Sequence, residues 1–213
     1  MKKSVYSITL LDDVVREVDR AAMRSGMTRS GLINRILAEH LGLATPEKRM
    51  RDIFTELSRL MSGDDNFLIN SQSEDSLFAV KSSLRFKYNP TIRYSVSIYP
   101  EDGEFFGELR AQLRTQNARL ISELDVFFAM WQKLEDAYFH LRLSDFGGGK
   151  FVRRLRLPSS TSPEKLGESA AEYIRHLNSG ISAHFELYPD INASAAYVSK
   201  LYGDYINRGT NIV

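Results

Sequence analysis

The sequence predicts an α+β fold, with a small N-terminal unit followed by a larger domain. Three observations lead to this expectation. A short alternating segment precedes two amphipathic helical segments within residues 1–43. Alternating runs separated by turns follow between residues 67 and 114, which is typical of a mostly antiparallel sheet. Apolar residues at three- and four-residue steps then predict a long helix over residues 115–141.

The composition is that of a folded chain. Lys and Arg number 28 and Asp and Glu 27 among 213 residues, so the formal net charge is +1, and 43% of the residues are hydrophobic. Wholesale disorder requires low hydrophobicity and high net charge, and is therefore excluded. Cys is absent, which excludes disulfides and thiolate metal sites. No apolar run is long enough to span a bilayer, and Asp12 and Asp13 interrupt the only candidate signal segment. These features favour a cytoplasmic, nucleoid-associated protein without a membrane partner.

Residues 5–10 alternate as a half-buried β-strand does. One face carries Tyr6, Ile8 and Leu10, and the other carries Val5, Ser7 and Thr9. No second strand follows before the first helix, so the backbone donors and acceptors of this strand need a partner. The simplest partner is the same strand of a second chain, which predicts a two-fold antiparallel ribbon.

Two short helices are expected after this strand. Asp12 or Asp13 is expected to cap the first helix, Gly26 to end it in a left-handed conformation, and Thr28 to cap the second. Their apolar faces consist of Val14, Val15, Val18, Ala21 and Ala22, and of Leu32, Ile33, Ile36, Leu37 and Leu41. A unit of this size is too small to bury so much apolar surface alone. The chain is therefore expected to form a homodimer or a higher oligomer.

The order of these elements resembles the ribbon-helix-helix family of the MetJ/Arc/CopG type. The matching segments are Ser7–Leu10, the helix through Val14 and Val18, the turn Gly26–Ser30, and Leu32-Ile33. The resemblance covers residues 1–43 only, and the rest of the chain resembles no family. It implies a sequence-specific DNA-binding regulator of transcription, such as a bacterial repressor, that inserts a dimeric β-ribbon into the major groove of double-stranded DNA.

The resemblance also implies which residues contact DNA. The base contacts would be made by Lys3, Val5, Ser7 and Thr9 on the face of the ribbon turned from the core. The phosphate contacts would be made by Lys2, Thr28, Arg29 and Ser30, the last three at the N-terminus of the second helix, where free N–H groups and the helix dipole favour an anion. The family often has a long basic or amide side chain at the first groove-facing position, where this sequence has Val5. Residues 1–43 hold seven basic and five acidic residues, so their net charge of +2 gives only modest long-range attraction to DNA.

A connecting helix is expected over residues 44–65, with Thr45 as its cap, and an α+β domain over residues 66–213. The connecting helix could pack on this domain or form a dimer contact. The long helix is expected to pack within its own domain rather than between subunits. The further expectations are strands over 67–71, 77–87, 92–99, 105–114 and 151–157, a turn at Gly147–Gly149, a helix from Ser162 to Gly180, a strand over 182–188 and a last helix over 192–206.

The larger domain offers no motif for catalysis. Its histidines do not cluster at metal-ligand spacing, and the glycines at 147–149 lack the Lys-Ser/Thr of a phosphate-binding loop. No cofactor, metal or catalytic residue is therefore expected, and the aromatic residues favour a core over a ligand pocket. Residues 66–213 are expected to serve oligomerisation, effector sensing or binding of a protein partner.

Three alternatives remain open at this stage. A plasmid partition or relaxation accessory protein would bind DNA at an origin rather than at a promoter. An antitoxin would wrap its toxin with residues 66–213, although antitoxin arms are usually disordered alone. An enzyme tethered to DNA by residues 1–43 is the alternative from another class, and no residue pattern indicates a reaction type for it.

Overall fold

The computed structural model describes residues 4–43, 45–69, 77–86, 89–99, 104–156 and 161–209. The chain divides into an N-terminal unit, residues 1–49, and a body, residues 50–213. Each unit has its own arrangement of elements. The structure is α+β with an antiparallel sheet, which confirms the predicted fold class at this level.

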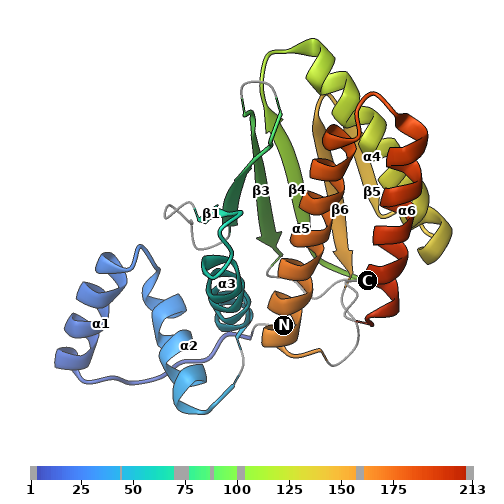
Figure 1. Cartoon of the computed structure of the whole chain (residues 1–213). Coiled ribbons are helices and arrows are strands. Elements are labelled where there is room, and N and C mark those ends of the chain that lie inside the picture. The colour runs from blue at the N-terminus through green and yellow to red at the C-terminus, as the bar shows by residue number, and fades with distance from the viewer. Residues whose placement is uncertain are drawn as a thin grey trace. The chain divides into compact units, whose positions relative to one another are not determined.

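The N-terminal unit contains two helices, α1 (Asp12–Arg24) and α2 (Arg29–His40) (Figure 1). Gly26 follows α1 with a φ of +62°, and the Thr28 hydroxyl accepts a hydrogen bond from the Gly31 N–H at 3.1 Å, so both predictions are confirmed. The predicted aspartate cap is wrong. Leu11 occupies the N-cap position of α1 without a side-chain cap. Asp12 and Asp13 instead lie in the first turn, where their negative charges interact favourably with the positive end of the helix dipole.

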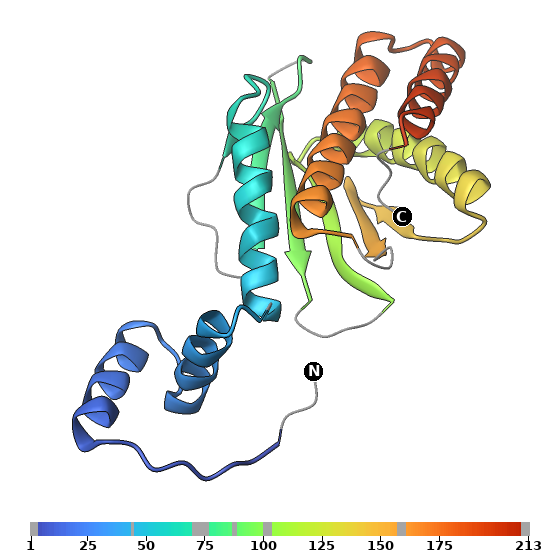
Figure 2. The same ribbon diagram turned by 90° about the horizontal axis from the view of Figure 1, so that it is seen from below.

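The predicted strand over residues 5–10 is not present as a strand in the single chain. The segment from residue 4 to α1 runs as extended chain without a paired neighbour (Figure 2). A β-strand exists only through hydrogen bonds to an adjacent strand. Within the described residues, the first paired strand is β1 (Leu68–Ile69), which belongs to the body. The ribbon-helix-helix arrangement is therefore not formed by one chain alone.

The body is built on a six-stranded sheet in the order β1-β2-β3-β4-β6-β5. All neighbouring strands are antiparallel. After β1, the strands are β2 (Leu77–Ser83), β3 (Thr91–Ile98), β4 (Phe105–Arg114), β5 (Ser144–Gly147) and β6 (Lys150–Arg156). Gly148 and Gly149 form the turn between β5 and β6 within the predicted turn 147–149, and Gly147 ends β5, a strand that was not expected.

Four helices pack on the sheet and on one another. They are α3 (Pro46–Ser62), α4 (Ala118–Phe139), α5 (Pro163–Glu186) and α6 (Ile191–Asn207), and in the body they gather on one side of the sheet (Figure 2). Phe54 of α3 stacks on Phe78 of β2, and Phe128 of α4 stacks on Phe151 of β6 at 5.1 Å between ring centroids. The connecting helix therefore packs on the body, and the predicted long helix is confirmed as an intradomain element.

Helix α5 continues through the point where the sequence predicts its end. Gly180 lies inside α5, and the predicted strand over residues 182–188 is wrong because α5 extends to Glu186. A Cβ atom at position 180 would lie 3.0 Å from the Trp131 ring and 3.1 Å from the Phe127 ring. Gly180 therefore allows α5 to approach α4 closely, and it does not form a turn.

Strand β3 shows how the sheet presents two different faces. Ile92, Tyr94, Val96 and Ile98 are buried toward the helices, while the intervening residues are partly exposed on the opposite face. This strict alternation is the predicted pattern for a sheet covered on one side. Among the described residues, no helix has the length and apolar character needed to cross a membrane.

Candidate nucleic-acid interface

The predicted DNA contacts belong to the N-terminal unit, which buries very little of its own surface. Among residues 4–43 and 45–49, only Ala22 and Leu32 are buried. On the predicted inner face of the strand segment, Tyr6 is 84% exposed and Ile8 60% exposed. Exposed apolar residues are common when scattered, but a contiguous set marks an interaction surface.

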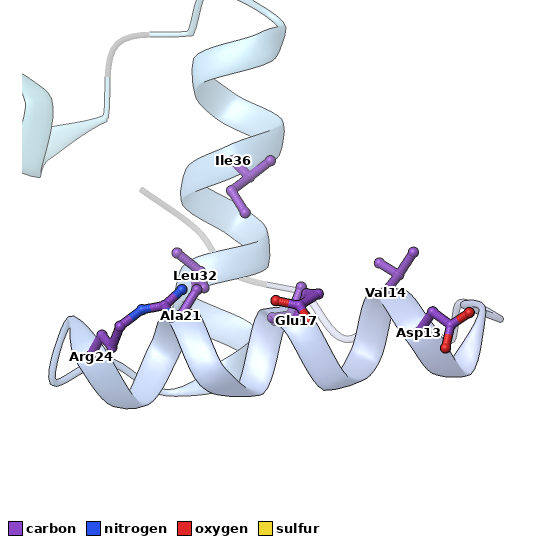
Figure 3. A pocket seen from close by; sticks show the side chains of 8 residues that line it. Asp13, Val14, Glu17, Ala21, Arg24, Leu32 and Ile36 are labelled. Carbon is purple, nitrogen blue, oxygen red and sulfur yellow. The ribbon is translucent and has the colours of Figure 1, made fainter.

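An apolar groove of about 510 Å³ lies between α1 and α2. Val14, Val18 and Ala21 line it from α1, and Leu32 and Ile36 line it from α2 (Figure 3). The charged residues at this groove, Asp13, Glu17 and Arg24, all come from α1. The groove shows that the two apolar stripes do not close on each other within one chain.

The residues predicted to contact bases are accessible where the structure describes them. Val5, Ser7 and Thr9 are exposed, and no ordered element of the N-terminal unit holds them in place. Lys2 and Lys3 lie outside the described residues. The structure thus leaves these side chains available without arranging them into a reading surface, which requires a second strand.

Three of the four residues predicted to contact phosphate, all but Lys2, lie at the N-terminus of α2. Thr28 is the cap of this helix, and Ser30 is exposed in its first turn. Arg29 forms a two-point ion pair with Asp19 of α1, with Nε–Oδ1 and Nη2–Oδ2 distances of 2.5 Å. The Arg29 guanidinium holds the pKa of Asp19 below its ordinary value. Asp19 was not singled out by the sequence, because ten residues separate it from Arg29 and no periodic pattern links them.

The pair between Asp19 and Arg29 affects how α2 could meet a phosphate. It fixes the Arg29 side chain at the helix N-terminus and neutralises much of its charge. Both side chains are about half exposed, so water screens the pair and a phosphate can compete for the guanidinium. Arg29 can therefore serve a phosphate only by sharing its donors with Asp19 or leaving it.

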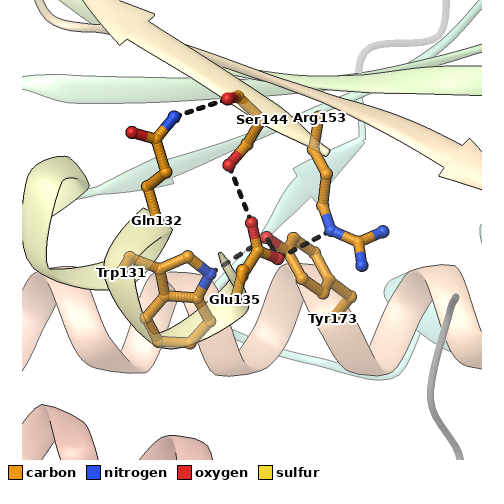
Figure 4. Close-up of polar contacts among 6 residues, drawn as sticks. All are labelled: Trp131, Gln132, Glu135, Ser144, Arg153 and Tyr173. Atoms are coloured by element: carbon orange, nitrogen blue, oxygen red, sulfur yellow. Dashed lines mark hydrogen bonds and ion pairs between the residues drawn. The ribbon is translucent and has the colours of Figure 1, made fainter. Parts of the chain in front are cut away.

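A second polar constellation lies deep in the body, around Glu135 of α4 (Figure 4). Its Oε1 accepts hydrogen bonds from Arg153 Nε at 2.7 Å and from the Tyr173 hydroxyl at 2.8 Å, and its Oε2 accepts one from the Ser144 hydroxyl at 2.9 Å. The Trp131 indole N–H donates to the Tyr173 hydroxyl at 2.9 Å. Donors from β5, β6 and α5 therefore surround one carboxylate of α4.

This buried network has the features of a structural ion pair. Glu135 and Arg153 are both 0% exposed. Burial disfavours the guanidinium charge and is the largest single influence, but the Glu135 carboxylate, Tyr173 and Tyr205 together outweigh it and raise the pKa of Arg153. Burial and the same carboxylate raise the pKa of Tyr173 well above its ordinary value. The Arg153 charge therefore persists at neutral pH, and the Tyr173 hydroxyl stays protonated as a donor. The structure separates Arg153, in the core, from Arg154 and Arg156 of the same strand, which are exposed.

Neither unit brings together a metal site in the part of the chain that the structure describes, where no group of three or more His, Asp or Glu residues converges. No protein-family model matches the chain, and neither a curated protein nor a solved structure matches it significantly. Function must therefore be argued from the residues and their geometry.

Proposed function

We propose that this protein binds double-stranded DNA sequence-specifically as a dimer and regulates transcription, most simply as a repressor. In the proposed dimer, residues 5–10 of two chains pair into an antiparallel ribbon that enters the major groove. The observation that carries the proposal is the exposed apolar side of this segment next to an open apolar groove between α1 and α2. This agrees with the resemblance of residues 1–43 to the ribbon-helix-helix family.

Dimerisation would satisfy what the single N-terminal unit leaves unsatisfied. Pairing gives hydrogen-bond partners to the backbone of residues 5–10, which has none in the described chain. Apolar side chains left exposed in α1 and α2, Val14, Ile36 and Leu37, could then pack against those of the second copy. Each fully buried side chain of this type contributes about 1.5–3 kcal/mol relative to exposure.

The same pairing would create a DNA-reading surface. If Tyr6, Ile8 and Leu10 face the dimer core, alternation turns Val5, Ser7 and Thr9 outward. A two-stranded ribbon fits the major groove, where hydroxyls hydrogen-bond to base edges and an apolar side chain meets a thymine methyl. The α2 N-terminus, with Thr28, Arg29 and Ser30, offers N–H groups and a positive dipole end for a backbone phosphate. Phosphate contacts fix the register, and the ribbon reads the sequence.

The test uses the full chain with Ser7→Ala and Thr9→Ala combined. Genomic fragments captured by the unaltered protein define its preferred site, and fluorescence anisotropy compares that site with a scrambled duplex. Each lost base contact is expected to reduce discrimination by about 1–3 kcal/mol, roughly 5- to 150-fold, while affinity for the scrambled duplex changes little. A matched control, Thr55→Ala with Ser62→Ala, removes exposed hydroxyls from α3 and is expected to keep full discrimination.

The outcomes separate the parts of the proposal. If the unaltered protein shows no preferred site, sequence-specific binding is wrong. If the ribbon variant discriminates as well as the control, residues 5–10 are not the reading surface. Captured sites at promoters support a transcriptional regulator, whereas a cluster at a replication origin supports a plasmid partition or relaxation accessory protein instead.

A further inference from the structure

The face of the sheet that points away from the helices carries a band of cations. Cross-strand register places Lys81 of β2 opposite Arg93 of β3, and Arg93 opposite Gln112 of β4. Gln112 in turn lies opposite Lys150 of β6, and Arg114 follows two residues beyond Gln112 on β4. These residues alternate with the buried core residues of their strands, so they share the opposite face. We call Lys81, Arg93, Arg114 and Lys150 the cationic band.

Three described acidic residues lie near this face, and two of them are toward the other end of the strands. The third, Asp145 of β5, lies opposite Val152 and 4.0 Å from Arg142. Glu108 pairs with Arg110 and accepts a hydrogen bond from the Tyr99 hydroxyl at 3.1 Å. Glu104 lies 3.5 Å from Arg156. Within the described parts of the chain, none of the four residues of the cationic band forms an ion pair with a carboxylate. Positive charge therefore stays uncompensated at the end of the sheet where β3 begins and β4 ends.

Arg93 carries the clearest sign of a missing partner. Its Nε atom is buried and has no hydrogen-bond partner among the described residues. Lys81, directly opposite on β2, carries the same charge. Like charges at directly opposed positions destabilise a sheet, and a buried donor without an acceptor is unfavourable. An anion bound over this pair would relieve the repulsion between the two like charges.

The remaining side chains of this face indicate what kind of anion fits. Around the cationic band they include the hydroxylated residues Ser83, Thr91 and Ser95, the amide of Gln112, and the small apolar residues Ala79 and Val152. The core of a protein interface is apolar and rich in aromatic residues, and a membrane-binding surface needs apolar side chains that insert. This part of the sheet offers neither. Lys, Arg, Ser and Thr side chains are the groups that contact the sugar-phosphate backbone of DNA.

The spacing of the cations also suits an extended polyanion. The cationic band crosses β2, β3, β4 and β6, so it spans three interstrand spacings of about 4.8 Å each, or roughly 14 Å. Successive phosphates along one strand of duplex DNA are separated by about 3.4 Å of helix rise, so several fall within this width. We propose that the cationic band binds the phosphate backbone of duplex DNA independently of base sequence. The proposal rests on the proposed function in one respect, because DNA is the polyanion that the N-terminal unit would bring to the chain.

The test is a double charge reversal, Arg114→Glu with Lys150→Glu, in the full chain. Affinity for a random-sequence duplex is measured by fluorescence anisotropy over a range of KCl concentrations. Each phosphate contact contributes about 0.9 to the slope of log affinity against log salt concentration, so a loss of about 2 in slope per chain is expected. The matched control, Lys165→Glu with Lys200→Glu, makes the same charge change at exposed positions on α5 and α6 and is expected to keep the slope.

Two further arms keep the result interpretable. The neutral variant Arg114→Gln with Lys150→Gln is expected to lose a similar slope, and thermal unfolding shows whether each variant is folded. If the sheet variants and the helix control weaken binding equally, the effect is one of net charge and the proposal is wrong. An unchanged slope in the folded sheet variants also overturns it.

The outcome of this test does not depend on whether the proposed function is correct. Loss of the cationic band is expected to lower the affinity for a preferred site and for a scrambled duplex by the same factor, so discrimination between them stays intact. The Ser7→Ala and Thr9→Ala variant is expected to lose discrimination while its affinity for the scrambled duplex changes little. Because the probe is a random duplex, the slope can be measured even if the chain has no preferred site.

Discussion

The two units of this chain differ in how much of their apolar surface they bury themselves. In the body, Leu124, Phe127 and Trp131 of α4 are completely excluded from solvent, and strands pair across the whole sheet. In the N-terminal unit, two helices bury only Ala22 and Leu32, and Val5 is 100% exposed. The difference teaches that the body encloses a core of its own, whereas the N-terminal unit leaves most of its apolar side chains exposed, as the proposed dimerisation would require.

The size and topology of each unit explain this contrast. A two-layer arrangement of a sheet and helices can enclose a core, because one face of each element turns inward. Two short helices and an extended segment cannot enclose a core, and a unit this small is only marginally stable without a disulfide, a metal or a partner. This chain has no Cys, and the described residues of the N-terminal unit form no metal cluster. This is why a second copy is the partner that we propose.

The largest expected effect comes from breaking the buried pair in the body. Arg153→Met leaves the Glu135 carboxylate buried without its cation, and such a change destabilises a protein by about 3–5 kcal/mol. Urea denaturation followed by the fluorescence of Trp131, the only Trp of the chain, measures the loss. The neighbouring change Arg154→Met, on the exposed face of β6, is the matched control and is expected to cost much less.

A second variant separates the charge from the packing. Replacing both partners, as in Glu135→Leu with Arg153→Met, is expected to recover much of the lost stability, because no unpaired charge remains in the core. Equal stability of the Arg153→Met and Arg154→Met variants would contradict the view that the pair lies within the body's own core.

The next effect is expected in the N-terminal unit and not in the body. Ile36→Asp places a charge in the groove between α1 and α2, where a partner chain would bury an apolar side chain. The change is expected to weaken dimerisation by about 1.5–3 kcal/mol per chain, which for two chains is roughly 100-fold or more in the dissociation constant. Sedimentation velocity over a range of protein concentrations measures this shift.

The same variant is expected to leave the urea midpoint of Trp131 fluorescence unchanged, since that residue reports on the body. Met23→Asp is the matched control, because Met23 is 86% exposed on α1 and does not line the groove. Dimers that persist in Ile36→Asp, or that dissociate equally in Met23→Asp, would show that the groove is not the dimer contact.

Local signals in the sequence predicted a large part of this fold. The positive φ of Gly26 and the Thr28 cap follow from steric and hydrogen-bonding properties of single residues. The alternation in residues 92–98 gives the correct strand and also the correct inner face, because the sheet is covered on one side only. For the same reason, the cationic residues on the other face of the sheet can be placed from the sequence once the register is known.

Other features depend on contacts between distant residues and were missed. Gly180 has the residue type of a helix end, and only the packing of α5 on the rings of Trp131 and Phe127 explains why it lies inside a helix. The ion pair of Asp19 with Arg29 joins two helices across a turn. The inward direction of Arg153 is decided by Glu135, which lies on another element. Each of these three features can be identified only from the tertiary structure.

The smallest predicted effect is on the pH dependence of the stability of the body, and it arises from a buried histidine. His184 of α5 is buried, its Nδ1 lies 2.7 Å from the Ser194 hydroxyl, and its Nε2 lies 3.2 Å from the Glu123 carbonyl oxygen. A carbonyl can only accept, so Nε2 carries the proton and Nδ1 accepts from Ser194 in the neutral ring. Burial lowers the pKa of His184, and the weaker influence of Glu123 acts in the opposite direction.

The sign of the pH dependence follows from this lowered pKa. Below the ordinary value of 6.5 the unfolded chain binds a proton that the folded body resists, so the contribution of His184 is fully present above pH 6.5. It is lost as the pH falls from 6.5 toward the lowered pKa of the folded state, with a slope of at most about 1.4 kcal/mol per pH unit. Urea denaturation of the full chain between pH 7.5 and 5, followed by Trp131, is expected to show a shallower slope in His184→Gln than in the unaltered protein. The control is His40→Gln, an exposed position on α2, and an identical slope in both variants would show that His184 is not the titrating group.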